Sequence, residues 1–103
     1  MVSECAGMIK TAVPAIRIAV ARLLKSKYRM GQLEIARGLG VTQASVNKYL
    51  NGRYSRSIGG AMASIRGKGL DRRIAKMVVS GISTHLVNES IDRAASSMPR
   101  VRG

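Results

Sequence analysis

The sequence predicts an all-α fold, a compact bundle of about five helices. Apolar residues recur at three- and four-residue spacing, and no segment alternates convincingly with a period of two. The 103 residues contain no Phe or Trp, so the core must be built from Ile, Leu, Val, Met and Ala, which suits packed helices. A hydrophobic content of 46% is that of a globular protein, and the length predicts one domain over residues 1–103.

The first predicted helix is "AIRIAVARLLKSKY", which follows Pro14 at an early position where the missing N–H costs little. Arg17 and Arg22 fall away from its apolar face, and a short leading helix is expected before it, within 3–13. The apolar face consists of Ile16, Ala19, Val20, Leu23 and Leu24.

Two short helices come next. Gly31 is an acceptable cap for "QLEIARGL", and Gly40 ends that helix. Thr42 is a good N-cap for "QASVNKYL", and Asn51-Gly52 supplies a left-handed stop. Neither helix is long enough to be stable alone, so both must be held by packing on each other and on the first helix.

Residues 53–69 form a basic, glycine-rich stretch that we expect to be a loop or a loosely helical connection. Residues 70–98 hold the last helices, either as a dimerisation surface or as core packing against the first helix. Asp71 begins one helix, Gly81 interrupts, and Thr84 caps the other. Their apolar residues are Leu70, Ile74, Met77 and Val78, then Val87, Ile91, Ala94, Ala95 and Met98. Pro99 ends the last helix, and a basic tail occupies 99–103.

The charge is the feature that points to a partner. Eighteen Lys and Arg against five Asp and Glu give a formal net charge of +13, shared by both halves of the chain. Such a charge attracts polyanions. Nucleic acid is therefore the leading partner class, and an anionic membrane surface is second.

Other classes of protein are disfavoured. Cys5 and His85 are the only residues of their types, too few for a disulfide, a zinc site or a Cys–His catalytic pair. The chain also has no paired carboxylates and no P-loop, so we expect neither an enzyme nor a cofactor. Arg17 and Arg22 interrupt the apolar stretch 12–24, so neither a signal peptide nor a membrane span is expected. We expect a cytoplasmic, nucleoid-associated protein with no visible small-molecule effector.

The segment 32–52 has the pattern of a helix-turn-helix unit, in which two short helices cross at about 90–120°. Ala36 supplies the small residue needed where the helices meet, and Gly40 tolerates the positive φ of the turn. The predicted core positions of the unit are Ile35, Ala36, Leu39, Gly40, Val41, Val46 and Tyr49.

These residues also carry a resemblance. "QLEIARGLGVTQASVNKYLNG" is similar to the helix-turn-helix of the lambda repressor and Cro superfamily. Together with Pro14-Ala15-Ile16-Arg17, it resembles small predicted archaeal transcriptional regulators over residues 3–53. The resemblance implies that residues 42–50 form a recognition helix in the major groove of double-stranded DNA. It also implies that Gln32 anchors on a phosphate and braces Gln43, which reads a base.

Side-chain chemistry favours some of the same residues. The amide of Gln43 can donate and accept at once, as pairing with adenine requires. Ser45 and Asn47 are the other predicted base contacts. The predicted phosphate contacts lie on both helices and just after them: Gln32, Arg37, Thr42, Lys48, Asn51, Arg53 and Arg56.

The sequence therefore predicts a sequence-specific, DNA-binding transcriptional regulator. It is expected to be a homodimer, because one such motif reads only a few base pairs. Two alternatives remain open: an antitoxin-type autorepressor with a toxin as protein partner, and a non-specific architectural DNA-binding protein. An RNA-binding role is weaker, because the chain has no aromatic stacking platform.

Overall fold

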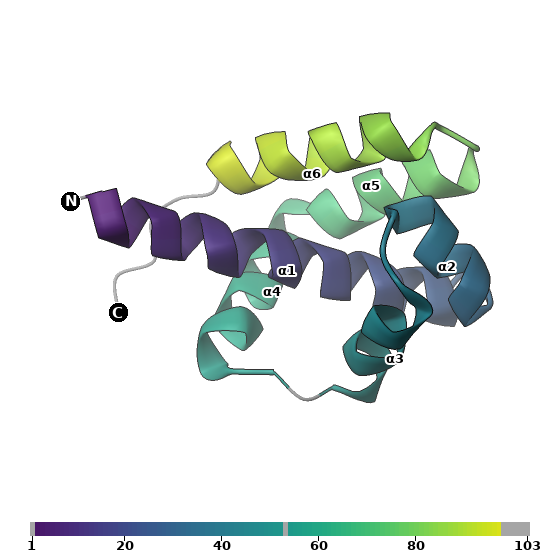
Figure 1. Cartoon of the computed structure of the whole chain (residues 1–103), viewed down its shortest axis with the longest axis horizontal. Helices are drawn as coiled ribbons and strands as arrows, with labels where there is room; N and C mark the ends of the chain where they lie inside the picture. Colours follow the sequence, from purple (N-terminus) through teal and green to yellow (C-terminus); the bar gives the residue numbers. More distant parts are fainter. Residues whose placement is uncertain (1, 53, 98–103) are drawn as a thin grey trace.

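The computed structural model describes residues 2–52 and 54–97, which form six helices and no strand (Figure 1). The helices are α1 (Val2–Ser26), α2 (Gln32–Leu39), α3 (Gln43–Asn51), α4 (Arg56–Lys68), α5 (Leu70–Val79) and α6 (Thr84–Ser97). The Cα radius of gyration is 12.9 Å, the value of a compact domain of this size. The predicted compact, all-helical fold is confirmed, with six helices instead of about five.

Helix α1 is the axis of the molecule and contacts each of the other five helices. Helices α5 and α6 lie on one side of it and α4 on the other, while α2 and α3 lie at its C-terminal end (Figure 1). The prediction of a single apolar face on α1 is wrong, because residues around its whole circumference are buried. The buried side chains are Ala12, Ala15, Ile16, Ile18, Ala19, Val20, Ala21 and Leu24, with Leu23 partly buried.

The N-terminal part of the chain also differs from the expectation. One helix runs from Val2 to Ser26, so there is no separate leading helix and Pro14 lies inside the helix. Proline removes one backbone hydrogen bond, but buried neighbours such as Ala15 and Ile16 pack tightly enough to keep the helix continuous. None of the described helices, this long one included, is long and apolar enough to cross a membrane.

Of the two expectations for the segment 53–69, a loop or a loosely helical connection, the helical one agrees with the structure, because α4 occupies most of the segment. Ser55 caps the helix by accepting a hydrogen bond from the Ile58 N–H at 3.3 Å, and Gly69 ends it with φ +71°. The segment contains a stripe of apolar residues at helical spacing, which packs against α1. Its many glycines made this pattern hard to recognise in the sequence. This stripe consists of Ile58, Ala61, Met62 and Ile65.

Helices α5 and α6 form as expected, and Gly81 separates them with φ +81°. Their apolar faces lie in the core, as Ile74, Val87 and Ile91 show, so packing against α1 is observed for this segment. Thr84 is the first residue of α6 and not its cap, since its hydroxyl donates to a carbonyl of α2 instead. The predicted roles of Met98, Pro99 and the tail lie outside the described residues.

Gly38 sets the distance between α2 and α5. A Cβ atom at this position would lie 2.6 Å from Cγ1 of Val78, closer than real side chains approach. Valine is stiff about χ1 in a helix, so it cannot easily turn aside. Only glycine therefore lets α2 lie this close to α5.

We expect Gly38→Ala to destabilise the domain relative to Gly60→Ala. Both substitutions add the same helix propensity, about 1 kcal/mol, but Gly60 has open space around it. The clash with Val78 should make the Gly38 variant about 1–3 kcal/mol less stable than the Gly60 variant in urea unfolding. Equal stability of the two variants would show that α2 does not pack on α5 this closely.

Candidate nucleic-acid interface

Helices α2 and α3 are joined by a turn of three residues, Gly40, Val41 and Thr42. Gly40 has φ +69°, and the Val41 N–H donates to the Ala36 carbonyl at 3.0 Å, which closes the end of α2. Thr42 caps α3 as expected, accepting a hydrogen bond from the Ser45 N–H at 3.1 Å. The predicted core positions Ile35, Ala36, Leu39 and Val46 are buried, and Val41 and Tyr49 are partly buried.

Helix α3 presents one continuous exposed face. Only Val46 is fully buried, while Ser45, Tyr49 and Leu50 are half-buried on the side toward the core. The remaining five residues share the other side of the helix, because they are spaced one, four, five and eight positions from the first. They are Gln43, Ala44, Asn47, Lys48 and Asn51.

The predicted base-contacting residues are not all on this face. Gln43 and Asn47 lie on it, whereas Ser45 lies beside it and its Oγ accepts a hydrogen bond from the Thr42 hydroxyl at 2.9 Å. The Asn47 Oδ1 accepts from the Asn51 Nδ2 at 3.0 Å, a bond that does not use the amide N–H groups of Asn47. Ala44, which the sequence did not single out, lies on the face too.

Gln43 itself is unengaged. Within the part of the chain that the structure describes, its amide has no hydrogen-bond partner, and no hydrogen bond joins it to Gln32. Gln32 is half-buried at the start of α2. The bracing between the two glutamines that the resemblance implies therefore stays a prediction.

The predicted phosphate-contacting residues surround α3. Lys48 and Asn51 are exposed on α3, and Thr42 precedes it. Arg37 is exposed in the last turn of α2, and Arg56 is exposed at the start of α4. Arg53 lies outside the described residues.

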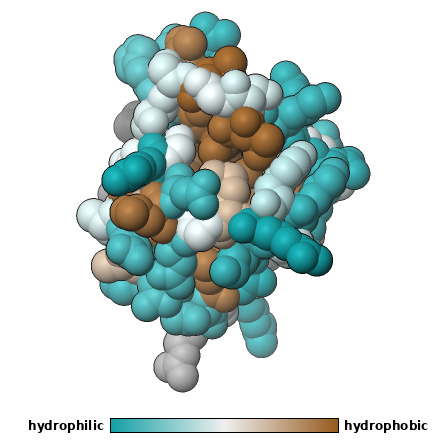
Figure 2. Space-filling model, turned by 90° about the vertical axis from the view of Figure 1, so that its right-hand side faces the viewer, coloured by the Kyte–Doolittle hydropathy of each residue, from teal (hydrophilic) through white to brown (hydrophobic). Residues whose placement is uncertain are grey.

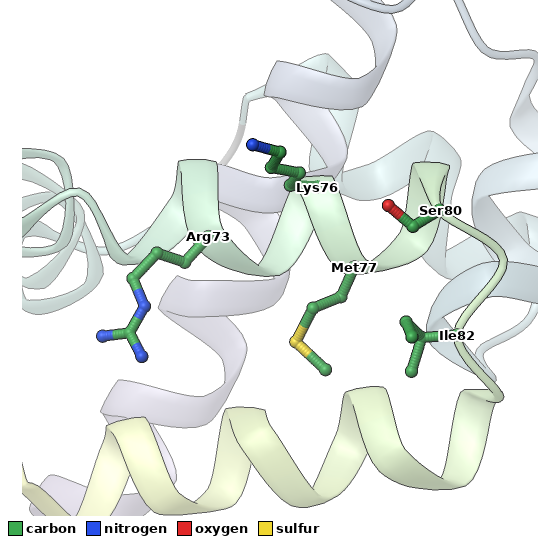
Figure 3. Close-up of a pocket in the computed structure, with 5 residues that line it drawn as sticks. All are labelled: Arg73, Lys76, Met77, Ser80 and Ile82. Atoms are coloured by element: carbon green, nitrogen blue, oxygen red, sulfur yellow. The ribbon is translucent and has the colours of Figure 1, made fainter.

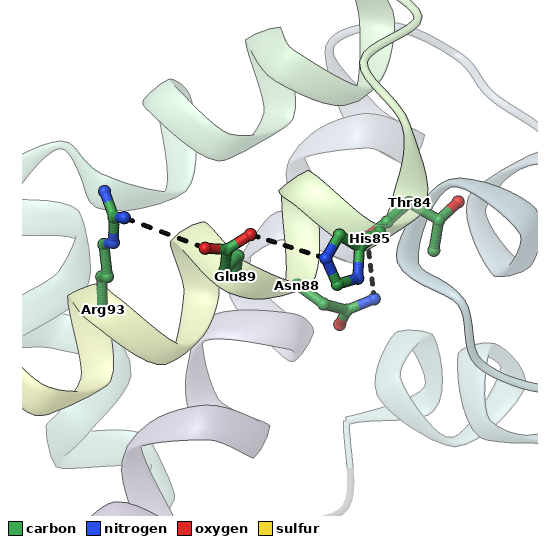
Figure 4. A network of polar contacts seen from close by, with 5 residues as sticks. All are labelled: Thr84, His85, Asn88, Glu89 and Arg93. Carbon is green, nitrogen blue, oxygen red and sulfur yellow. Dashed lines mark hydrogen bonds and ion pairs between the residues drawn. The ribbon is translucent and has the colours of Figure 1, made fainter.

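The C-terminal end of α2 is held by α6. Carbonyl groups in the last turn of a helix have no partner within the helix, and here two side chains of α6 satisfy them. The Thr84 hydroxyl donates to the Arg37 carbonyl at 2.8 Å, and Asn88 Nδ2 donates to the Leu39 carbonyl at 3.1 Å. Figure 4 shows how Asn88 and Thr84 lie together at the start of α6, where Asn88 also donates to the Thr84 carbonyl.

A guanidinium from α1 completes this junction. Arg17 Nη2 donates to Oδ1 of Asn88 at 3.3 Å, so one side chain of α6 links α1 to the end of α2. A cation near the C-terminal end of a helix is favoured by the helix dipole. A side chain at Gly40 would collide here, because its Cβ would lie 2.6 Å from Cγ2 of Thr84.

Arg22 of α1 holds the C-terminal end of α3. Its Nε donates to the Tyr49 carbonyl of α3 at 3.3 Å, and its guanidinium lies 5.1 Å from the centre of the Tyr54 ring. Gly52, with φ +77°, leaves room for it, since a Cβ there would lie 2.6 Å from Arg22 Nη2. Arg22 thus fixes the C-terminal end of α3 against α1.

The charge around α3 is mainly positive, with Glu34 in the first turn of α2 as the exposed carboxylate of these two helices. No Asp or Glu occurs between Glu34 and Asp71, although this stretch carries six cations: Arg37, Lys48, Arg53, Arg56, Arg66 and Lys68. Asp71 is buried, and Glu89 and Asp92 lie on α6, which makes few contacts with α3. A polyanion approaching α3 therefore meets cations from three successive helices.

No protein-family model matches the chain, and no characterised protein or solved structure is significantly similar to it.

The hydroxyl of Thr84 should contribute to the stability of the α2–α6 junction. Thr84→Val keeps the shape of the side chain but removes the donor to the Arg37 carbonyl, which should cost about 0.5–1.5 kcal/mol in urea unfolding. Thr84→Ser, the control, keeps the donor and should be the more stable of the two. If the valine variant matches the serine variant, the hydroxyl does not hold α2.

Proposed function

We propose that the chain is a sequence-specific DNA-binding transcriptional regulator. In this proposal α2, the turn 40–42 and α3 form a helix-turn-helix, and α3 lies in the major groove of double-stranded DNA. The observation that carries the proposal is the exposed face of α3, where polar side chains form one stripe. The opposite side of this helix packs against α1 and α2.

The residue types on this face are those that read base edges. Gln43 and Asn47 can each donate and accept hydrogen bonds, as adenine recognition requires, and the methyl group of Ala44 can contact the methyl group of thymine. Lys48 and Asn51, farther along the helix, are suited to the backbone. A helix face that served only to keep the protein in solution would not need to combine these amides with the surrounding cations Arg37, Lys48 and Arg56.

The electrostatics supports the same proposal. Counterion release from phosphates drives DNA binding, and the cations of α2, α3 and α4 flank the exposed face. The N-terminal end of α3 adds a partial positive charge, since its first N–H groups lie at the exposed turn after Thr42. The cations and the N-terminal end of α3 attract duplex DNA of any sequence, so they account for affinity. The amides on the exposed face of α3 account for specificity.

A second copy of the chain is part of the proposal, because one α3 reads only a few base pairs. Three large apolar side chains are exposed around the turn between α5 and α6: Val79 (47%), Ile82 (40%) and Leu86 (49%). Figure 2 views this end of the molecule and shows apolar surface gathered there, bordered by polar side chains. We define these three residues as the apolar end and propose it as the dimer contact.

Selection of bound sites from random duplex DNA tests the proposal, and two variants sharpen the test. Gln43→Ala should weaken binding to the selected site by about 1–3 kcal/mol and change binding to scrambled DNA little, because it removes a base contact. Arg56→Ala should weaken binding to both DNAs alike and lower the slope of log K against log salt by about one, because it removes a phosphate contact.

The comparison of the two DNAs decides between functions. A selection that yields no consensus, together with equal losses on both DNAs for Gln43→Ala, would contradict sequence reading by α3. The architectural alternative, in which the charge alone binds duplex DNA, would then replace it.

The dimer contact is tested at Leu86. Leu86→Glu should reduce the mass in sedimentation from dimer to monomer, because it places a charge in the apolar end. Leu33→Glu on α2 is the matched control, since Leu33 is equally exposed (50%) and lies outside the apolar end. A dimer that survives Leu86→Glu, or one that Leu33→Glu dissociates equally well, would place the contact elsewhere.

A further inference from the structure

The surface over α5 and α6 contains a groove that the proposed DNA contact does not use. A hollow of about 330 Å³ lies between the two helices, with Leu70, Ile74, Met77 and Ala94 as its apolar lining. A shallower hollow of about 240 Å³ continues it over α5 toward Ile82. Arg73 and Met77 line both hollows, and we call the two together the α5–α6 groove.

Figure 3 shows how the side chains lie in the outer part of this groove. Met77 points from α5 toward α6, Ile82 lies beside it at the turn, and Arg73 extends one turn before it. Methionine is flexible and polarisable, so it adapts to apolar side chains of different shapes. The floor of the groove is thus suited to receive the apolar side of a partner.

The rim of the groove is cationic. Arg73, Lys76 and Arg93 line it, and no carboxylate of the described part of the chain does. Arg73 and Lys76 form no ion pair within residues 12–52 and 54–97. Arg93 lies 3.8 Å from Glu89, which also lies 3.7 Å from His85 (Figure 4). Both pairs are exposed, so the ion pair with Glu89 holds Arg93 only weakly.

An apolar floor with a cationic rim is complementary to one kind of occupant, an amphipathic helix whose polar side is acidic. Helix α5 has ten residues and is about 15 Å long, which matches three turns of a partner helix. A second copy of this chain is a poorer fit. Among the described helices only α6 has two exposed carboxylates, and Arg93 lies beside them.

We propose that the α5–α6 groove binds an acidic amphipathic helix of another protein. The groove is separated from α3 by α1, so DNA and this partner can bind at the same time (Figure 1). The inference does not rest on the proposed DNA contact, because neither the groove nor its cations belong to the exposed face of α3. Ile82, at the outer end of the groove, also belongs to the apolar end, so the groove and the proposed dimer contact share this one residue.

The test uses the full chain and a fluorescent helical peptide of about 18 residues, with leucines at i, i+3, i+4 and i+7 spacing and glutamates elsewhere. A peptide of the same composition with scrambled order is the first control. At roughly physiological salt, which screens the general field of the protein, the amphipathic peptide should bind at least tenfold more tightly in fluorescence anisotropy.

Two groove variants and one matched variant locate the binding. Lys76→Glu on the rim and Met77→Glu on the floor should each lower peptide affinity at least tenfold. Arg66→Glu makes the same charge change as Lys76→Glu at an exposed position of α4, outside the groove, and should lower it less than threefold. Lys76 is exposed, so its variant is expected to fold even if the Met77 variant does not.

Three results would overturn the proposal. Equal affinity for the two peptides, or an equal loss in Arg66→Glu, would show that only the net charge attracts the peptide. If Lys76→Glu or Met77→Glu changes the sedimentation mass and leaves peptide affinity unchanged, the groove is a contact between copies of this chain. Duplex DNA binding of the same variants reports separately on the proposed function.

Discussion

Every other helix packs against α1, so this one helix has to meet five neighbours at once. Alanines on several sides let the neighbouring backbones approach, while Ile16, Val20 and Leu24 fill the space between them. The dependence is strongest for α2 and α3, which have eight and nine residues and would not be stable helices alone. Packing against α1 therefore determines how α2 and α3 are oriented, and which face of α3 is exposed, as much as their own sequences do.

Two arginines of α1 extend this control beyond apolar packing. Arg22 donates to a carbonyl of α3, and Arg17 reaches α6 through Asn88, which in turn donates to a carbonyl of α2. These bonds join residues 27, 71 and 49 positions apart in the chain. The C-terminal helices consequently support the candidate interface directly, because without α6 the Arg37 and Leu39 carbonyls would lose their side-chain donors.

The parts of the structure that could be predicted from the sequence are those with local signals. Gly31, Thr42 and the left-handed Gly40 and Gly52 mark the ends of α2 and α3 within one or two residues. For α4 the sequence left a loop or a loosely helical connection open, because the glycines of this segment outweighed an apolar stripe at helical spacing. The roles of Arg17, Arg22 and Gly38 depend on helices distant in sequence, so no local pattern contains them. Ser45 is half-buried beside the exposed face and accepts a hydrogen bond from Thr42, so its predicted base contact stays a prediction.

The net charge of +13 overstates the charge available to any one partner. Arg17 and Arg22 are engaged in holding helices together, and the Nε of Arg17 is buried without a partner among the described residues, so these cations cannot reach a ligand freely. Among the other cations that the structure describes, Lys48 lies on α3 and Arg56 on α4, whereas Arg73 and Lys76 lie on α5. Counterion release depends on the cations that touch phosphate, not on the total. The proposed DNA contact thus implies a moderate salt dependence, and the cations of α5 form a surface apart from it, where we propose that an acidic helix binds.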